Sequence, residues 1–222
     1  MKTRLLLIRH AQSEWNASGR WQGQADPPLN ETGREQARQL AAYLLRRREA
    51  PVAAYASPLQ RAAETAQIVC APFELKPVLD ERLKEYDIGA FQGLTAEEVE
   101  ARYASVWNDL QTRINWVPIP EAESRAAFCD RTLAALADIH ARHPGQAVVV
   151  VTHGGVLGTY LTCILGLDRE RHSPFQFGNA SLSILEHDRR GPRLSVLNDT
   201  CHLHGAWPDE GIPPQEGHGP KP

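Results

Sequence analysis

The sequence predicts a single α/β domain built around a mostly parallel sheet. The chain has 222 residues, about the length of one domain with one well-filled core. Along the first 70 residues, short apolar runs alternate with segments of helical periodicity in the order strand, helix, strand, helix. A valine-rich run at 147–151 is the strongest strand signal in the chain and also leads into a helical segment. Alternation of this kind is typical of parallel sheets covered by helices.

The first four elements each have a local reason. A strand at 3–8 is almost entirely apolar and ends at Arg9 and His10. Asn30 can cap the first helix, whose apolar side chains recur at helical spacing until the basic residues 46–48. The second strand and the second helix are expected at 52–56 and 59–70.

The second half of the chain is less regular. Thr95 can cap a short acidic helix, and a longer helical pattern runs over 123–140. The segment between them, which contains Trp107 and Trp116, is expected to be irregular. The remaining elements are the strand at 147–151, a helix up to Leu165, and strands at 181–185 and 194–197 with a turn at 188–192.

Neither an internal repeat nor a linker divides the chain. We therefore expect one domain over residues 1–204. In the last segment, 205–222, nine of eighteen residues are Gly or Pro, which predicts a flexible tail.

The composition excludes several classes of protein. Hydrophobic residues at 42% and charged residues at 23% are ordinary for a globular chain, so a disordered, fibrous or membrane-embedded protein is disfavoured. The net charge is −3 with no long run of one sign, so neither nucleic acid nor a membrane surface is an expected partner. The apolar run after Lys2 and Arg4 is too short for a signal peptide, which predicts a cytoplasmic protein.

Arginine and cysteine usage adds two points. The chain has 20 Arg and 4 Lys, which is typical either of bidentate recognition of phosphate or carboxylate or of a coding bias. The four cysteines lie far apart without a Cys-x-x-Cys pair, so free thiols are expected rather than a disulfide framework or a zinc site.

Three motifs of phosphate-handling enzymes can be tested against the sequence. It contains neither a Gly-x-x-x-x-Gly-Lys loop nor an Asp-x-Asp pair, which disfavours nucleotide-dependent and magnesium-dependent transfer. Cys163 and Arg169 have the Cys-x5-Arg spacing of a thiolate phosphatase. However, Cys163 lies in an apolar helical stretch rather than in a loop of free N–H groups.

Histidine is the better candidate nucleophile. His10 and His153 each follow an expected strand, and the carboxyl ends of parallel strands meet at one edge of a sheet. For either residue alone, a helix-capping or a buried, hydrogen-bonded histidine would be the commoner explanation. His202 and His204 have a His-x-His spacing, but only two ligands are visible and a structural role is expected, so no metal and no cofactor are predicted.

Several further motifs occur in a fixed order and carry a family resemblance. They are Leu7-Ile8-Arg9-His10-Ala11-Gln12-Ser13-Glu14-Trp15-Asn16, Gly19-Arg20-Trp21-Gln22-Gly23, Ser57-Pro58-Leu59-Gln60-Arg61-Ala62, Leu83-Lys84-Glu85 and Thr152-His153-Gly154-Gly155. The chain resembles the histidine phosphatase superfamily, in its phosphoglycerate mutase-like branch. The resemblance implies a three-layer α/β/α sandwich with a mostly parallel central sheet and an imidazole that accepts the phosphoryl group.

The resemblance also assigns roles to residues. The implied catalytic residues are His10, Glu85, His153, Arg9 and Arg61, and the implied phosphate-binding residues are Arg9, Asn16, Gln22, Gly23, Arg61 and His153. The two arginines suit the non-bridging phosphate oxygens, where charge collects in phosphoryl transfer. Glu85 would protonate the leaving alkoxide and then activate water.

The motifs leave the reaction open between hydrolysis and isomerisation. In mutases of this family, the motif that begins with the acid–base glutamate usually reads Glu-Arg-His-Tyr-Gly. Here it reads Glu85-Tyr86-Asp87-Ile88-Gly89, and Asp87 would repel a second anionic group of the substrate. We therefore expect a metal-independent phosphomonoester hydrolase acting through a phosphohistidine on a small organic phosphate. A cofactor-dependent phosphoglycerate mutase and a non-catalytic phosphate-binding module are the alternatives, and a homodimer is possible.

The substrate is also open. Candidates are phosphorylated sugars, phosphoglycerate derivatives and the ribazole phosphate of cobalamin assembly. Five aromatic residues could form a wall over the substrate or belong to the core. They are Trp15, Trp21, Phe91, Trp107 and Trp116.

Overall fold

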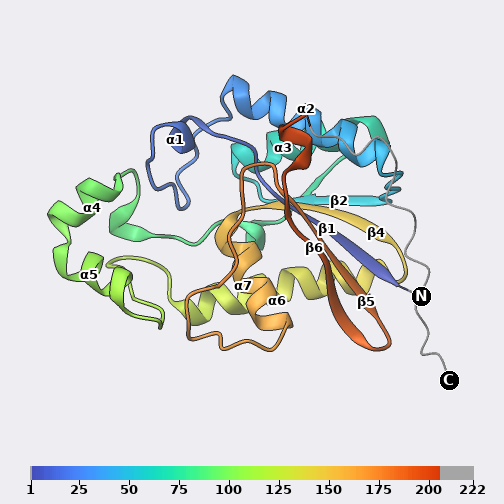
Figure 1. Ribbon diagram of the computed structural model, residues 1–222. Helices are drawn as coiled ribbons and strands as arrows, with labels where there is room; N and C mark the ends of the chain where they lie inside the picture. Colours follow the sequence, from blue (N-terminus) through green and yellow to red (C-terminus); the bar gives the residue numbers. More distant parts are fainter. Residues whose placement is uncertain (1, 206–222) are drawn as a thin grey trace.

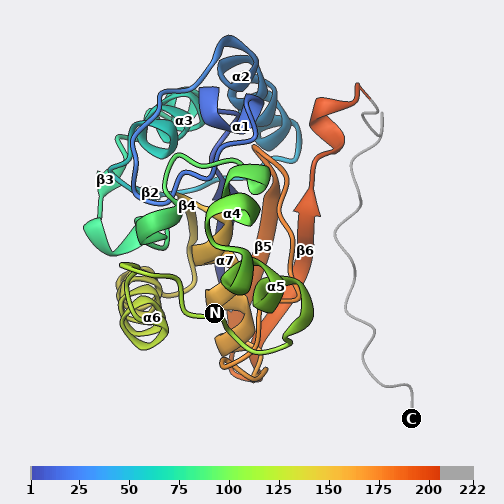
Figure 2. The same cartoon turned by 90° about the vertical axis from the view of Figure 1, so that its left-hand side faces the viewer.

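The computed structural model describes residues 2–205, and the expected tail lies outside the described residues except for Gly205. Six strands form one sheet in the order β3-β2-β4-β1-β5-β6; β3 is labelled in Figure 2 and the other five strands in Figure 1. The pairs β1·β4, β2·β4 and β2·β3 are parallel, whereas β5 runs antiparallel to β1 and to β6. The sheet is therefore parallel at its centre with an antiparallel hairpin at one edge, as the mostly parallel prediction requires.

The strands and helices have the following bounds. The strands are β1 (Thr3–Arg9), β2 (Ala53–Ala56), β3 (Val78–Leu79), β4 (Ala147–Thr152), β5 (Leu182–Asp188) and β6 (Gly191–Asp199). The α-helices are α1 (Glu14–Ala17), α2 (Glu31–Arg46), α3 (Gln60–Cys70), α4 (Ala96–Arg102), α5 (Ala104–Thr112), α6 (Arg125–Arg142) and α7 (Gly154–Ile164). Short 3₁₀ turns lie at Ala71–Phe73, Glu81–Leu83, Gly89–Phe91 and Cys201–Leu203.

Helices cover both faces of the sheet, which makes three layers (Figure 1). Successive side chains of a strand point to opposite faces, so β1 contributes to two cores. Leu6 and Ile8 pack with α2 and α3, whereas Leu5 and Leu7 pack with α6 and α7. Burial on both faces explains the unbroken apolar runs at 5–8 in β1 and 147–151 in β4.

Most expected elements are confirmed, including the caps. The side chain of Asn30 accepts a hydrogen bond from the N–H of Gly33, and Thr95 forms a capping box with Glu98. The expected irregular structure around Trp107 is wrong, because residues 104–112 form α5. No side chain caps that helix and none of its residues is buried, so it lacks the signals that mark a helix in a sequence.

The carboxyl ends of β1 and β4 lie at the same edge of the sheet. The register pairs Arg9 with Thr152, so the residues that follow, His10 and His153, leave adjacent strands side by side. Helices α1, α4 and α5 lie beyond this edge (Figures 1 and 2). Over the described residues, no helix has the length and apolar character needed to cross a membrane.

Candidate active site

His10 is buried at the end of β1, with one ring nitrogen committed to the backbone. Nδ1 lies 2.8 Å from the carbonyl oxygen of Ala11. A carbonyl oxygen only accepts hydrogen bonds, which assigns the proton to Nδ1. The lone pair is therefore at Nε2, where it is available for nucleophilic attack.

His153 lies next to His10, with ring centroids 5.1 Å apart and planes inclined by 59°. Its Nε2 is 2.8 Å from Oγ of Ser57, and its buried Nδ1 has no hydrogen-bond partner. Because the Ser57 hydroxyl can donate to Nε2, the neutral ring can carry its proton at Nδ1. The expected meeting of the two histidines at one sheet edge is confirmed.

Arg9 and Arg61 bring two guanidinium groups to this edge. Nη1 of Arg9 donates to the carbonyl oxygen of Phe177 at 2.6 Å. Arg61 donates to the carbonyl oxygens of Ala25 at 2.7 Å and Gly23 at 2.8 Å. Nε of both side chains is buried without a hydrogen-bond partner, and neither guanidinium forms an ion pair within residues 2–205. Burial lowers the pKa of both groups, that of Arg61 to about 10, so both remain positively charged near neutral pH.

Burial and these cations keep the two imidazoles neutral. The pKa of His10 lies well below its usual value because the ring is buried and because Arg61 and Arg9 are positively charged. The pKa of His153 is lowered in the same way, first by burial and then by Arg61. A neutral His10 is the form with the nucleophilic lone pair.

Asn16 and Gln22 present amide groups that are already oriented. Oδ1 of Asn16 accepts from the N–H of Ser13 at 3.1 Å and from Nδ2 of Asn179 at 3.2 Å. Oε1 of Gln22 lies 2.8 Å from the hydroxyl of Ser13. Because both amide oxygens are occupied, the NH₂ groups are left to donate elsewhere.

Gly23 acts through its backbone. Its φ is +51°, and a Cβ at this position would lie 2.6 Å from a side-chain carbon of Ile88. Its carbonyl oxygen accepts the hydrogen bond from Arg61. Glycine therefore lets the loop pass closely enough to hold the guanidinium.

Glu85 places its carboxylate at the N-terminus of α7. Oε1 accepts from the N–H of Tyr86 at 2.8 Å, and Oε2 accepts from the N–H of Gly155 at 3.0 Å. A Cβ on Gly155 would overlap the Glu85 carboxylate. Glycine at residue 155 is thus required for this position of Glu85.

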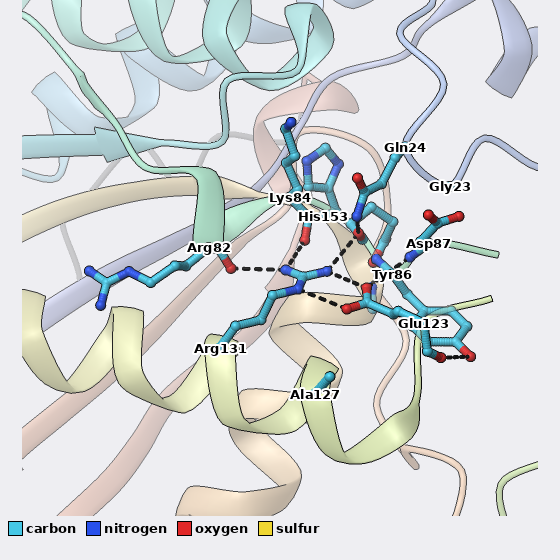
Figure 3. Close-up of polar contacts among 12 residues, drawn as sticks. Gly23, Gln24, Arg82, Lys84, Tyr86, Asp87, Glu123, Ala127, Arg131 and His153 are labelled. Carbon is cyan, nitrogen blue, oxygen red and sulfur yellow. Dashed lines mark hydrogen bonds and ion pairs between the residues drawn. The ribbon is translucent and has the colours of Figure 1, made fainter. Parts of the chain in front are cut away.

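Arg131 of α6 binds the backbone on the N-terminal side of Glu85 and at Glu85 itself, and Figure 3 shows its contacts with Arg82 and Lys84. Its guanidinium donates to the carbonyl oxygens of Arg82, Lys84 and Glu85 at 2.9, 2.6 and 2.8 Å. It also pairs with Glu123, whose Oε1 accepts from the N–H of Asp87. One arginine thus fixes the loop before and after the acidic residue.

These groups surround a pocket of about 390 Å³, within the size range of small-molecule sites. Seven of the eight expected site residues line it: Arg9, His10, Asn16, Gln22, Gly23, Arg61 and Glu85. The eighth, His153, is fully buried beside His10. Of the five aromatic candidates, Trp21 and Trp116 line the pocket, whereas Phe91 is buried in the protein interior.

Comparison with known proteins places the chain in a family. The model of the histidine phosphatase superfamily (branch 1) matches residues 5–200. The chain belongs to this superfamily. Phosphoserine phosphatase 1 of Hydrogenobacter thermophilus is 36% identical over 200 residues, which cover 90% of this chain and 94% of that protein. The metal-independent phosphoserine phosphatase of Arabidopsis thaliana is 39% identical over 205 residues, covering 90% and 83%.

A comparison with solved structures gives the same fold. The Bacillus stearothermophilus protein YhfR has a TM-score of 0.82 and 32% identity, and the match covers 90% of this chain and 99% of that one. The predicted family and the three-layer α/β/α class are confirmed.

Some residues of this histidine phosphatase site were missed by the sequence analysis. Ser57 holds His153, Asn179 holds Asn16, and Arg131 holds the Glu85 loop. Ser57 begins the motif Ser57-Pro58-Leu59-Gln60-Arg61-Ala62, which is a usable signal, whereas nothing local marks Asn179 or Arg131. Cys163, at the end of α7, and the pair His202 and His204 do not line the pocket.

The ligand-free protein should show both imidazoles neutral at pH 6. Their lowered pKa values mean that the neutral forms persist below the ordinary histidine value of about 6.5 and are lost only when pH falls through the lower value. Nitrogen-15 NMR of the histidine rings measures both titration and tautomer, and His10 should carry its proton at Nδ1. Titration of His10 near pH 6.5, or a proton at Nε2, would contradict the site described above.

Proposed function

We propose that this protein hydrolyses a small organic phosphomonoester through a phosphohistidine at His10, without a metal ion. The observation that carries the proposal is a set of buried donors without partners next to a free imidazole lone pair: Nε of Arg9, Nε of Arg61 and Nδ1 of His153. Buried donors are rarely left unpaired, and Arg9 and Arg61 line the pocket beside His10, where a phosphate dianion would accept hydrogen bonds from them. The metal-independent phosphatase named among the relatives supports the same reaction.

The reaction proceeds in two displacements. Nε2 of His10 attacks phosphorus while the bond from phosphorus to the ester oxygen breaks, and the leaving alkoxide takes a proton from Glu85. Arg9, Arg61, Asn16 and His153 donate to the non-bridging oxygens, where negative charge collects. Glu85, now a carboxylate, removes a proton from water. The resulting hydroxide attacks phosphorus, the nitrogen–phosphorus bond breaks, and inorganic phosphate leaves.

The fixed pocket explains how one site serves both steps. Oε1 and Oε2 of Glu85 are held by two backbone N–H groups, so the same oxygens can face first the leaving group and then the water. Trp21 and Trp116 provide apolar surface for the organic part of a small substrate.

Initial rates distinguish the possible reactions. We expect phosphate release from p-nitrophenyl phosphate with a chelator present. The parallel reaction uses 3-phosphoglycerate with 2,3-bisphosphoglycerate and follows isomer formation. Chelator-resistant release that exceeds isomerisation supports the proposal. Fast isomerisation with little release would make the protein a mutase, and tight phosphate binding without turnover of any ester would make it a binding module.

A further inference from the structure

Arg125 is a cation on the pocket wall that the proposed chemistry does not use. It is the first residue of α6, and together with Trp116 and Thr159 it lines the same pocket as His10. Nη1 donates to the hydroxyl of Thr159 at 2.8 Å, and Nε donates to the carbonyl oxygen of Arg169 at 3.2 Å. Three of the five N–H groups on the side chain remain for another acceptor, or for the aromatic ring described next.

The charge of Arg125 is not compensated. Within residues 2–205 it forms no ion pair, and Nη2 is buried without a hydrogen-bond partner. The guanidinium lies over the ring of Trp116, 4.2 Å from its centroid, which fixes its plane and stabilises the cation in part. A half-buried cation without a counter-charge is costly, and an anion in the pocket would offset that cost.

Arg20 also lines the pocket, but unlike Arg125 it has a carboxylate partner. Nη1 of Arg20 lies 3.0 Å from the carboxylate of Glu98 and 2.6 Å from the carbonyl oxygen of Gly93, so its charge is already paired. Asp87, which the sequence suggested as a source of repulsion, does not line the pocket, and its Oδ1 accepts from the N–H of Gly89. Glu85 is the one acidic residue among the described residues that line the pocket, and its oxygens accept from the N–H groups of Tyr86 and Gly155 rather than from Arg125.

The positions of Gly155 and Thr159 on α7 show how far Arg125 lies from the Glu85 carboxylate. Gly155, which holds the Glu85 carboxylate, and Thr159, which holds Arg125, are four residues apart and lie on one face of the helix. The rise per residue puts them about 6 Å apart along the axis. A substrate with its phosphate at His10 and a carboxylate one short carbon chain away could therefore reach both groups.

We propose that Arg125 binds a carboxylate of the substrate, so that the site selects phosphomonoesters of small hydroxy acids or amino acids over those without a carboxylate. This inference rests on the proposed function, because it names the substrate class of the same pocket. Arginine suits the role because its planar fork binds a carboxylate through two parallel hydrogen bonds.

The test compares two substrates that differ only by the carboxylate, O-phosphoserine and O-phosphoethanolamine. The measured quantity is the ratio of their kcat/KM values, in which the amount of folded enzyme cancels. We expect the wild-type ratio to exceed one, and Arg125→Gln to lower it roughly 10- to 100-fold, the range of a charged hydrogen bond. Arg125→Lys keeps a charge and should restore part of the ratio.

Arg113→Gln is the matched control. Arg113 is exposed, pairs with Asp109 of α5 and does not line this pocket, so the ratio should not change. An equal ratio in wild type and Arg125→Gln would overturn the inference and leave Arg125 as a tether between α6 and α7. Wild-type inactivity on p-nitrophenyl phosphate, O-phosphoserine and O-phosphoethanolamine alike overturns the proposed function as well, whereas turnover of the latter two with an unchanged ratio overturns only the carboxylate site.

Discussion

His10→Ala should lower kcat for every phosphomonoester by at least about 10⁴-fold, because the variant has no nucleophile to form the covalent intermediate. The remaining donors stay in place, since Arg9 and Arg61 are held by backbone carbonyl oxygens rather than by the imidazole. We therefore expect the variant to keep binding inorganic phosphate. Steady-state rates and titration calorimetry with phosphate measure the two properties separately.

A quench experiment with a labelled substrate identifies the covalent intermediate. Wild-type protein quenched during turnover of a ³²P-labelled ester should hold label that survives alkali and is lost in acid, as a phosphoramidate does. His143→Ala is a suitable control, because His143 also follows an arginine but bonds Tyr55 and Gln146 far from the pocket lining. Label on a cysteine, or substantial turnover by His10→Ala, would show that the imidazole of His10 is not the nucleophile.

The sequence predicts those parts of the fold that depend on local signals. Strands β1 and β4 are buried on both faces and therefore contain the unbroken apolar runs 5–8 and 147–151, and Asn30 and Thr95 cap their helices as expected. Strand β3 could not be found in this way. It has two residues, Val78 and Leu79, both exposed, and it exists because they pair with β2. Pairing between distant segments leaves no local pattern.

In the candidate site, too, the residues marked by local signals were predicted and the contacts between distant residues were not. Strand ends predict that His10 and His153 meet, and motif order adds Arg61 and Glu85. The groups that orient them are contacts between distant residues: Arg131 reaches the carbonyl of Glu85 across 46 positions, and Ser57 reaches His153 across 96. The acceptor of the His10 proton is the carbonyl oxygen of Ala11, a backbone atom that every residue has. The residue types in the sequence therefore do not show which atom accepts the hydrogen bond from His10.

Glu85→Gln should lower kcat about 10²- to 10⁴-fold on alkyl phosphates, the range of general acid–base catalysis. An alkoxide is a poor leaving group and needs the proton, whereas p-nitrophenolate leaves readily without one. The amide can keep a hydrogen bond from Gly155 through its oxygen, so the loss concerns the proton rather than the fold. The effect on formation of phosphohistidine should therefore be much smaller with p-nitrophenyl phosphate.

Hydrolysis of the intermediate still requires Glu85 to activate water. Rapid mixing of Glu85→Gln with p-nitrophenyl phosphate should release a burst of nitrophenolate close to one equivalent of enzyme, followed by a slow steady rate while phosphohistidine accumulates. An equal loss on alkyl and aryl esters without a burst would show that Glu85 does not carry the proton in either step.

Gly155→Ala tests the position of the same carboxylate without removing it. The added Cβ would overlap the Glu85 carboxylate, so we expect the same pattern as Glu85→Gln at about 10- to 100-fold. Gly154→Ala is the matched control, because a Cβ there meets Arg9 only at 3.8 Å, an ordinary contact. Both variants gain helix propensity, so lower activity in Gly155→Ala alone would reflect displacement of Glu85. Equal activity in the two variants would mean that Glu85 moves freely, and that the two N–H groups do not fix the proton donor.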